Sequence, residues 1–510
     1  MLASDAVVLD EARTGVDAAS AAASTRNTRV ARNIAVLLVS QLFIWVAGSG
    51  LGILLPRYLG DTDVGRLSFA FSLTTLFGVV VVFGADTYLA REVARRPGEI
   101  GHLAFNAVLS RVPVLLAAFG AMALFVNALH YPEPTKQLVY VLSIIMGLML
   151  VNGVCVAALQ GLERMTLTSA ASIIEKIISG VLGVGAVALA GMGMIGYSFV
   201  LLAAASVSTS IIVVHFVRVA PPSFRIDFGV WRELFRGGAP FMLWAVALLI
   251  YGSVDITMLS IMTRDDVVGW YSTAYRFIGI ATFFPSAITA ALLPNISNVG
   301  VKESRPLIRR CLDIAMLMSV ALTVFFFVGA SAIIDFLGYP EGFRHTVLLL
   351  RILSLHIPLT TFAMVSGSVV IASNRESART KAGVIAAVVN PILNLAAIPF
   401  FAHAYNDGAI GAAITSVIIE VFMTSVMFAL VPRGTFHRAN LSRFLRSAVA
   451  GAVMAALMIA ASPGGLLPMA LLGGFGFGVT ALLVRAISIG DMTSMIGTVM
   501  KRKTASAPAS

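Results

Sequence analysis

Long apolar runs dominate this sequence and limit what it can fold into. About fourteen runs of roughly 18–25 residues are each long enough to cross the hydrocarbon core of a bilayer as a helix. Backbone groups in lipid must satisfy their own hydrogen bonds, which favours helices for such runs. The chain is 58% hydrophobic and only 12% charged, with a mean hydropathy of +0.92. This composition excludes an ordinary soluble domain, and we predict an all-α integral membrane protein.

The expected membrane spans form two sets of six and a final pair. The first set covers 34–56, 65–87, 103–129, 137–159, 168–190 and 195–217. The second set covers 238–262, 267–292, 309–334, 346–372, 382–402 and 408–431. The final pair covers 443–462 and 466–487. We therefore predict two six-helix bundles followed by two additional C-terminal helices.

Changes in composition suggest where these parts begin and end. Residues 1–32 are rich in Ala, Ser and Thr without a continuous apolar core, so they are predicted to be a disordered cytoplasmic tail rather than a signal peptide. The other expected parts are an N-terminal bundle at 33–219, a cytoplasmic interfacial linker at 220–237, a C-terminal bundle at 238–432, an additional helix pair at 433–490 and a cytoplasmic tail at 491–510.

The linker contains apolar residues at helical spacing between charges. These residues are Val230, Trp231, Leu234 and Phe235. The pattern is typical of a helix that lies on the inner leaflet. The alternative is an ordinary linker whose tryptophan reaches toward the membrane.

Two short segments in the first bundle are repeated in the second. Residues 61–70 align with residues 265–274, and five of the ten positions are identical by inspection of the sequence. The segment 193–196 is echoed by 408–411. Both pairs fall at equivalent places in the hydropathy pattern, and weak internal symmetry of this kind is typical of duplicated transporter bundles.

The distribution of Lys and Arg predicts the orientation. If both termini are cytoplasmic, most of these residues outside the apolar runs fall on the inner side. The outer segments then hold only Arg57, Arg66, Lys136, Arg264, Arg344 and Arg351. This bias predicts a multi-pass protein of the cytoplasmic (inner) cell membrane and makes the bundle repeat parallel. It also accounts for the net charge of +11 without a nucleic-acid partner.

Two charges inside the hairpin of residues 238–294 indicate a transport pathway. Asp255 and Arg276 each lie about eight residues from the connecting turn, and so at similar depth on neighbouring helices. Arg276 is a candidate for gripping a phosphate through two parallel hydrogen bonds. Asp255 is a candidate for lining the substrate cavity and holding Arg276 in place, or for binding a coupling ion, H⁺ or Na⁺. A purely structural ion pair between them is the alternative.

Other polar residues lie inside the expected spans. Arg111 is a further candidate for contacting the substrate, and Asp86 and Glu420 are candidates for ion coupling. Asp86 and Arg111 lie near the inner surface, so pairing there is the competing interpretation. Asn390 and Asn394 share one helix face and would line a polar cavity or bond neighbouring helices together.

The sequence offers little for chemistry outside transport. The adjacent Glu175 and Lys176 cannot both face one cavity. No HExxH or GxSxG motif is present, and Cys155 and Cys311 lack metal-ligand spacing. The seven histidines are assigned to loops or helix ends. We therefore expect no catalytic residue, metal or cofactor, and a protein that is not an enzyme.

Several motifs, in order along residues 30–490, resemble the polysaccharide transporter (Wzx-type oligosaccharide flippase) family of the multidrug/oligosaccharidyl-lipid/polysaccharide exporter superfamily. They are Arg57-Tyr-Leu-Gly60 with Val64-Gly65, Ala90-Arg-Glu-Val93, Gln160-Gly-Leu-Glu-Arg-Met165, Val254-Asp255, Val268-Gly-Trp-Tyr271 with Ala274-Tyr-Arg276, Pro294, Asn390-Pro-Ile-Leu-Asn394 and Gly408-Ala-Ile-Gly-Ala-Ala413.

The resemblance implies a MATE-like fold with a central, often cationic cavity, in which Arg276 and Arg111 would supply positive charge. It implies a flippase for a polyprenyl-diphosphate-linked glycan, such as an O-antigen, capsule or exopolysaccharide repeat unit. Membrane lipids and polysaccharide polymerase or assembly proteins would be partners.

Alternating access between the bundles is the expected mechanism. Three alternatives stay open. A lipid II flippase would be expected to carry charge in its first helix, and this chain has none between Asn33 and Arg57. A cation-coupled drug antiporter of the MATE type would need an acidic cavity. A membrane glycan polymerase or ligase would need a sizeable outer loop.

Overall fold

The computed structural model describes residues 52–486, apart from the side chain of Trp244. The expected first span, 34–56, falls almost entirely outside this range, as do both predicted tails. Every regular element in the described range is helical. Thirteen helical stretches are long and apolar enough to cross a membrane, in agreement with the remaining expected spans. The chain is therefore a multi-pass membrane protein.

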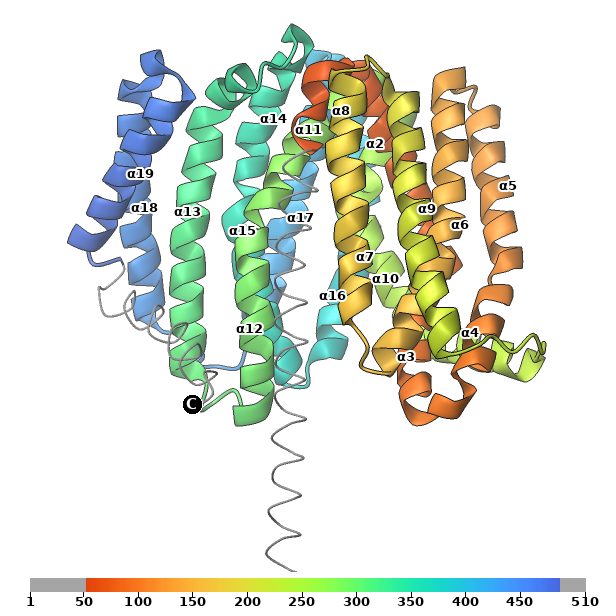
Figure 1. Cartoon of the computed structure of the whole chain (residues 1–510). Helices are drawn as coiled ribbons and strands as arrows, with labels where there is room; N and C mark the ends of the chain where they lie inside the picture. Colours follow the sequence, from red (N-terminus) through yellow and green to blue (C-terminus); the bar gives the residue numbers. More distant parts are fainter. Residues whose placement is uncertain (1–51, 487–510) are drawn as a thin grey trace, which may run out of the picture.

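The helices run mostly antiparallel to one another along one direction (Figure 1). The N-terminal bundle comprises α2 (Leu55–Val82), α3 (Ala85–Arg95), α4 (Ile100–Leu109), α5 (Val112–Ala128), α6 (Glu133–Gly161), α7 (Thr166–Ile177), α8 (Gly183–Ala188) and α9 (Met194–Val219). The C-terminal bundle comprises α10 (Phe228–Met262), α11 (Asp265–Ala281), α12 (Phe283–Val299), α13 (Arg305–Phe336), α14 (Arg344–Ser354), α15 (His356–Ala372), α16 (Glu376–Tyr405) and α17 (Gly408–Leu430).

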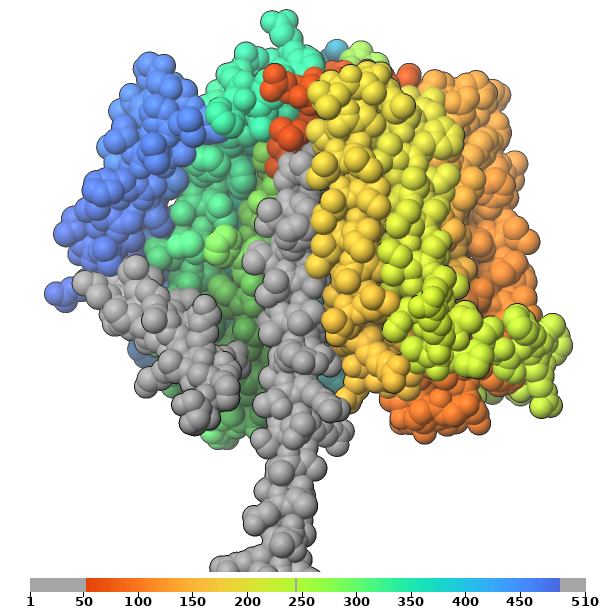
Figure 2. Space-filling model, in the orientation of Figure 1, coloured from red at the N-terminus to blue at the C-terminus, as the bar shows by residue number. Residues whose placement is uncertain are grey.

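The last two helices form a separate pair at the edge of the molecule. They are α18 (Arg438–Ala460) and α19 (Leu466–Leu483). Figure 2 shows them as a block beside the C-terminal bundle, and Figure 1 places α13 next to them. Their shared core includes Met454, Met458 and Phe477, packed with Leu317 and Val320 of α13.

Several expected single spans are broken into two helices. The span 65–87 is interrupted at Phe83 and Gly84, whose φ angles of 54° and 64° are left-handed. Gly84 is required there, because an added Cβ would lie 2.6 Å from the backbone nitrogen of Met242. The span 267–292 breaks at Thr282, three residues before Pro285, and the span 346–372 breaks at Leu355.

The predicted linker helix exists, but it continues without interruption into the next span as the first part of α10. Asp227 caps it by accepting hydrogen bonds from the backbone nitrogens of Gly229 (2.8 Å) and Val230 (3.3 Å). These N–H groups hold the pKa of the Asp227 carboxyl below its usual value. Val230 and Leu234 are buried in a core shared with α3 and α4, so the segment packs on protein as well as facing the surface.

A buried asparagine fixes the linker to the N-terminal bundle. Asn106 of α4 donates to the carbonyl of Arg225 (2.9 Å) and accepts from the backbone nitrogen of Asp227 (2.9 Å) and from Trp231 Nε1 (2.9 Å). The first residues of α10 are thus tied to the bundle that precedes them in the chain. This explains why Trp231 is part of the protein packing and not only a membrane contact.

The repeated segments face each other across the interface between the bundles. A Cβ added to Gly65 would lie 1.7 Å from the carbonyl oxygen of Asp265, and one added to Gly269 would lie 2.0 Å from that of Asp61. The sequence repeat pairs Asp61 with Asp265 and Gly65 with Gly269, so the two contacts are reciprocal. This confirms the parallel pseudo-repeat and shows that α2 and α11 approach closely because both positions are glycine.

Further contacts surround this reciprocal glycine contact, and together we name them the upper seam, after their position in Figure 1. Arg66 Nε pairs with Asp265 Oδ2 at 2.8 Å, and Trp270 Nε1 donates to Asp61 Oδ2 at 3.1 Å. Tyr131 Oη and Ser260 Oγ lie 3.1 Å apart. The bundles are therefore joined at the end of the molecule that carries the turn at 263–264.

Candidate functional site

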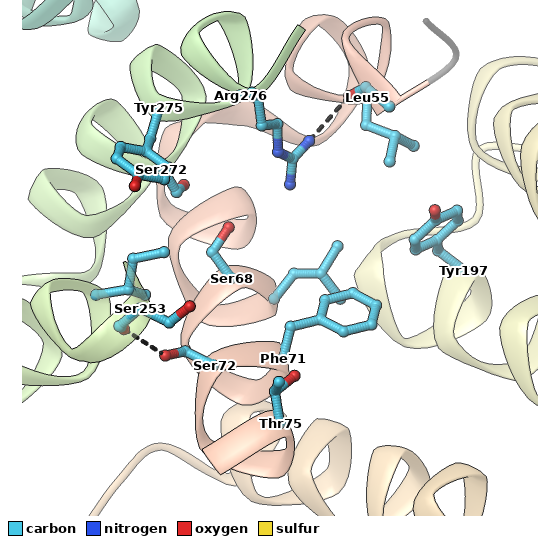
Figure 3. A pocket seen from close by; sticks show the side chains of 14 residues that line it. Leu55, Ser68, Phe71, Ser72, Thr75, Tyr197, Ser253, Ser272, Tyr275 and Arg276 are labelled. Atoms are coloured by element: carbon cyan, nitrogen blue, oxygen red, sulfur yellow. Dashed lines mark hydrogen bonds between the residues drawn. The ribbon is translucent and has the colours of Figure 1, made fainter. Parts of the chain in front are cut away.

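A cavity of about 510 Å³ lies between the two bundles, and we name it the central cavity (Figure 3). Its walls come from α2 and α9 on one side and from α10 and α11 on the other. Its lining residues are Gly52, Leu55, Leu67, Ser68, Phe71, Ser72, Thr75, Tyr197, Ser253, Ile256, Ser272, Tyr275, Arg276 and Gly279. Half of these side chains carry a hydroxyl group, and Arg276 is the one cationic side chain among them.

Arg276 reaches the cavity from α11 and makes one hydrogen bond to the residues that the structure describes. Its Nη1 donates to the carbonyl oxygen of Gly52 at 2.8 Å. Figure 3 shows the other terminal nitrogen directed into the cavity. No carboxylate lies within ion-pair distance of Arg276 in the part of the chain that the structure describes. A guanidinium has five N–H donors, so it can still bind an anionic group in two places.

Asp255 does not hold Arg276, contrary to one of the sequence-based expectations. Its carboxylate is buried inside the C-terminal bundle and accepts hydrogen bonds from Tyr271 Oη (2.8 Å), Ser416 Oγ (2.7 Å) and Asn394 Nδ2 (2.7 Å). Four neutral groups, counting Asn390 beyond Asn394, therefore surround this charge. Neither the ion pair with Arg276 nor a place in the lining of the central cavity is found for it.

Glu420 is a second buried carboxylate of the C-terminal bundle, and it lies about one helical turn from Asp255 along the bundle axis. It is also buried, and it accepts a hydrogen bond from Tyr251 Oη. The Nε2 atom of His356 lies 3.5 Å from Glu420 Oε2, and His356 Nδ1 lies 2.7 Å from Thr360 Oγ1. Asn390 donates to the carbonyl oxygen of Tyr251 at 3.2 Å. Glu420 thus has a histidine beside it, whereas the only ionisable side chain hydrogen-bonded to Asp255 among the described residues is Tyr271.

Residue spacing explains why the two carboxylates lie in separate layers. On an α-helix, residues four apart share a face and are displaced by about 6 Å along the axis. Four helices each supply such a pair, namely Tyr251 and Asp255, Tyr271 and Tyr275, Asn390 and Asn394, and Ser416 and Glu420. Because these helices alternate in direction, Asp255, Tyr271, Asn394 and Ser416 form one layer, and Tyr251, Tyr275, Asn390 and Glu420 form the other.

A second cavity, of about 320 Å³, adjoins the layer that contains Glu420, and we name it the C-terminal cavity. Its polar lining residues are Tyr251, Tyr275, Thr282, Ser286, His356, Thr360, Asn390 and Ser416. Tyr275 and Gly279 line both cavities. The α11 segment that carries Arg276 is therefore the wall between the central cavity and the C-terminal cavity.

Arg111 and Asp86 form an ion pair in which Arg111 is buried and Asp86 is half-buried, and neither residue lines the central cavity. Arg111 is 1% exposed, and its Nη1 lies 2.7 Å from Asp86 Oδ1. Asp86 lines a mostly apolar groove of about 530 Å³ between α2, α6 and α10. The structure thus shows the pairing that was the competing interpretation, and neither residue lines the central cavity or the C-terminal cavity.

The other predicted polar residues are placed as follows. Asn394 is fully buried and bonds both Asp255 and Asn390 (2.6 Å), so it connects helices rather than lining a cavity. Asn390 connects helices and also lines the C-terminal cavity. Glu175 and Lys176 pair with each other at 3.3 Å, away from either cavity.

Sequence reasoning missed His356. His356 does lie at a helix end, as predicted for the seven histidines, but this end is the start of α15 in the middle of the apolar helical stretch Glu341–Ala372. The break between α14 and α15 makes it a helix end at membrane depth. The available signal was a lone histidine ten residues into the expected span 346–372. Tyr197, Tyr251 and Tyr271 were also missed, because tyrosine is common near membranes.

Comparison with known proteins supports the same fold. The sequence is 25% identical over 409 residues to the probable low-salt glycan biosynthesis flippase Agl15 of Haloferax volcanii, covering 76% of this chain and 80% of that protein. The structure matches the lipid II flippase MurJ in its inward closed conformation with a TM-score of 0.72, at 16% identity, over 87% of this chain and 97% of MurJ.

An inward-facing multidrug resistance MATE transporter of the MOP superfamily matches with a TM-score of 0.58 and 17% identity, over 79% of this chain and 93% of the transporter. At these identities the structural likeness establishes the fold alone. The family described as polysaccharide biosynthesis protein matches residues 30–299, which is more than half of the 510 residues. The chain therefore belongs to the polysaccharide biosynthesis protein family, as its resemblance to the polysaccharide transporters predicted.

Proposed function

We propose that this protein is a flippase that moves a polyprenyl-diphosphate-linked oligosaccharide across the cytoplasmic membrane by alternating access. The observation that carries the proposal is Arg276, a cation without a carboxylate partner among the described residues, in a hydroxyl-lined cavity between the bundles. An unpaired charge at membrane depth is costly, so its retention favours an anionic ligand.

The chemistry of the central cavity suits each part of such a substrate. The free N–H groups of Arg276 match the oxygens of a diphosphate, which a guanidinium binds through charge-assisted hydrogen bonds. The hydroxyl groups of Ser68, Ser72, Ser253 and Ser272 can donate to and accept from sugar hydroxyls. The polyprenyl tail would remain in the lipid.

The orientation of the chain places the upper seam relative to the membrane. We propose, from the bias of Lys and Arg, that both termini are cytoplasmic and that the turn at 263–264 faces outward. The upper seam then joins the bundles on the outer side. Toward the inner side α3 also packs on α10, where a Cβ added to Gly238 would lie 2.5 Å from the carbonyl oxygen of Phe83, so entry of a headgroup from the cytoplasm would require these helices to separate. Outward movement of an anion is favoured by an inside-negative potential, by about 2.3 kcal/mol per charge and 100 mV.

The likeness to glycan flippases favours a glycan headgroup. The relative Agl15 is named as a probable glycan biosynthesis flippase, and MurJ as a lipid II flippase. We propose an O-antigen, capsule or exopolysaccharide repeat unit as the substrate, with lipid II as the alternative. The positive charge of Arg276 argues against a cationic drug. A polymerase or assembly protein docking on α18–α19, and ion coupling through Asp255 or Glu420, remain parts of this proposal.

Reconstituted protein tests the proposal. Proteoliposomes would be loaded with a fluorescent polyprenyl-diphosphate oligosaccharide, and exposure of its headgroup would be followed with a membrane-impermeant quencher. We expect flipping by the wild type, loss in Arg276→Ala, and wild-type flipping in Arg438→Ala. Arg438 is a matched control because it is exposed, at the start of α18. Cation-driven drug uptake without headgroup flipping would contradict the proposal.

A further inference from the structure

We propose that the exposed side of the linker between the bundles binds anionic phospholipids of the adjacent leaflet. We name the side chains concerned the linker surface. They are Phe224, Arg225, Ile226, Phe228, Arg232 and Arg236. Three observations carry the proposal: arginines without carboxylate partners, exposed apolar side chains between them, and contacts that hold the segment in place. Neither the binding nor its test depends on the proposed transport function.

The arginines of the linker surface are not neutralised by the protein. Arg225, Arg232 and Arg236 are exposed, and none of them has a carboxylate within ion-pair distance in the part of the chain that the structure describes. A guanidinium has five N–H donors and binds phosphate oxygens through charge-assisted hydrogen bonds. These three side chains are therefore available to a phosphate group outside the protein.

The acidic residues of the same segment have other partners. Asp227 caps α10, and one of its oxygens lies 3.5 Å from His102 Nε2. Glu233 accepts a hydrogen bond from Tyr88 Oη at 3.0 Å and pairs with Arg96. Both carboxylates are thus directed to α3 and α4, and the linker surface keeps a net positive charge.

The side chains between these arginines are large, apolar and exposed. Phe224, Ile226 and Phe228 are 78%, 54% and 72% exposed. Each ring touches the protein at one edge, since Phe224 packs on Phe105 with centroids 5.4 Å apart and Phe228 packs on Trp231 with centroids 4.9 Å apart. A patch of this kind marks contact with a partner that is partly apolar. An acidic protein segment would match the arginines and leave the rings in water, whereas an anionic lipid matches both.

The position of the linker fits this partner. Figure 2 shows the segment projecting from the lower right edge of the molecule, and Figure 1 places it at the level of the lower ends of α5 and α9. Helices that cross the membrane therefore begin and end beside it. The orientation proposed above makes this level the surface of the inner leaflet, where anionic headgroups attract basic segments.

Helical spacing separates the linker surface from the protein core. Phe228, Arg232 and Arg236 are four residues apart in α10, so they share one face of the helix. Val230 and Leu234 lie on the opposite face and are buried against α3 and α4. One face is thus used for packing, and the other presents an aromatic ring and two cations together.

The linker is also fixed at its start, middle and end. A Cβ added to Gly101 would lie 2.2 Å from the carbonyl oxygen of Pro221, and one added to Gly237 would lie 2.1 Å from the ring of Tyr88. Asn106 holds the middle through its bonds to the backbone of the linker. A lipid would therefore meet a surface that is already formed, which lowers the ordering cost of binding.

Quenching of a fluorophore on the linker would measure this binding directly. Ser223→Cys, at an exposed position beside the linker surface, would be labelled with bimane in full-length protein whose Cys155 and Cys311 are replaced by alanine. Nanodiscs of phosphatidylcholine would contain an equal small fraction of either phosphatidylglycerol or phosphatidylcholine that carries a nitroxide on its acyl chain.

We expect both labelled lipids to quench the fluorophore, and phosphatidylglycerol to do so about fivefold more effectively or better. One arginine near an anionic membrane surface contributes about 1 kcal/mol, which corresponds to about fivefold. Absence of quenching by both lipids would place the linker outside the membrane. Equal quenching by the two lipids would show contact without recognition of charge. Either result would overturn the proposal.

Two matched variants assign the preference to the linker. Arg225→Gln/Arg232→Gln should lower the preference for phosphatidylglycerol to less than about twofold. Arg433→Gln/Arg438→Gln makes the same change of charge at exposed positions between α17 and α18, and it should keep the wild-type preference. Equal preference in both variants would contradict the role of the linker arginines.

Salt provides a second measurement that needs no substitution at an arginine. At 1 M salt the Debye length is about 3 Å, compared with about 10 Å at 0.1 M. The preference for phosphatidylglycerol should therefore fall toward one, while quenching by labelled phosphatidylcholine stays constant. A preference that does not change with salt would overturn binding through the charge of the headgroup.

Discussion

The reciprocal glycines of the upper seam give a sharp test of how the bundles close. Ordinary contact between a Cβ and an oxygen begins near 3.4 Å, whereas a Cβ at position 65 would lie 1.7 Å from the Asp265 carbonyl and one at position 269 would lie 2.0 Å from that of Asp61. Both obstructions are backbone atoms, which cannot rotate away. Gly65→Ala or Gly269→Ala therefore forces α2 and α11 apart by more than 1 Å, on the order of the overlap.

This separation should shift the balance between closed and open seam. Overpacking of this kind costs roughly 1–3 kcal/mol, which corresponds to about a 5- to 150-fold loss of the closed state relative to the open one. Both substitutions act on one contact region, so the double variant should cost less than the two single variants added together.

Spin labels at two exposed positions on either side of the seam would report the shift. Glu133 belongs to the N-terminal bundle and Arg264 to the C-terminal bundle, and their side chains are 73% and 64% exposed. Cys155 and Cys311 would first be replaced by alanine. We expect Gly65→Ala to broaden or lengthen the 133–264 distance distribution. Gly120→Ala, where an added Cβ meets nothing within 4 Å, should leave it unchanged. An unchanged distribution in a folded Gly65→Ala protein would refute the glycine contact as the closing element.

Three further predictions concern the linker and the buried layers. Asn106→Ala leaves Trp231 Nε1 and the backbone N–H of Asp227 without their acceptor. It should lower the free energy of unfolding by about 1–3 kcal/mol and speed tryptic cleavage at Arg225. A cleavage rate like that of the wild type would contradict the role of Asn106. Asp227→Ala should lower the unfolding temperature at pH 7. The pKa of Asp227 is lowered on folding, so its stabilising effect is complete above the unfolded pKa of about 4 and is lost as the pH falls through the folded pKa. The difference in unfolding temperature between Asp227→Ala and the wild type should therefore shrink in acid. A difference that stays constant with pH would refute the charge dependence of the cap. Tyr271→Phe removes one donor from the buried Asp255 and should destabilise the protein by about 1.5–3 kcal/mol, measured by thermal unfolding in detergent against the Tyr405→Phe control at an exposed position.

The sequence was sufficient to predict the spans and the repeat, because hydropathy and local identity act within single segments. It could not show that Gly65 packs against the backbone of Asp265 and Gly269, since that depends on how the bundles dock. The helix breaks at Gly84 and Leu355 were also hidden, because each interrupts an apolar run without changing its hydropathy.

The candidate site was predicted in its residues more than in its geometry. Arg276 was identified from its charge, and the structure places it in the central cavity. Asp255 was expected beside it from equal depth, but depth does not fix the direction in which a side chain points around the helix. Asp255 instead faces α16 and α17, where Asn394 and Ser416 bond it. His356 became visible only through its partner Glu420, which lies 64 residues later by position in the sequence.

Binding of a soluble substrate analogue to Arg276 tests the central claim most directly. Isothermal titration calorimetry would compare a short-chain prenyl-diphosphate disaccharide with its uncharged prenyl disaccharide counterpart, using wild type, Arg276→Ala and Arg438→Ala. A two-point charge-assisted contact worth about 1.5–3 kcal/mol predicts that Arg276→Ala weakens binding of the diphosphate roughly 10- to 150-fold and leaves binding of the uncharged analogue unchanged. Equal affinity of wild type and Arg276→Ala for the diphosphate would contradict a headgroup site in the central cavity.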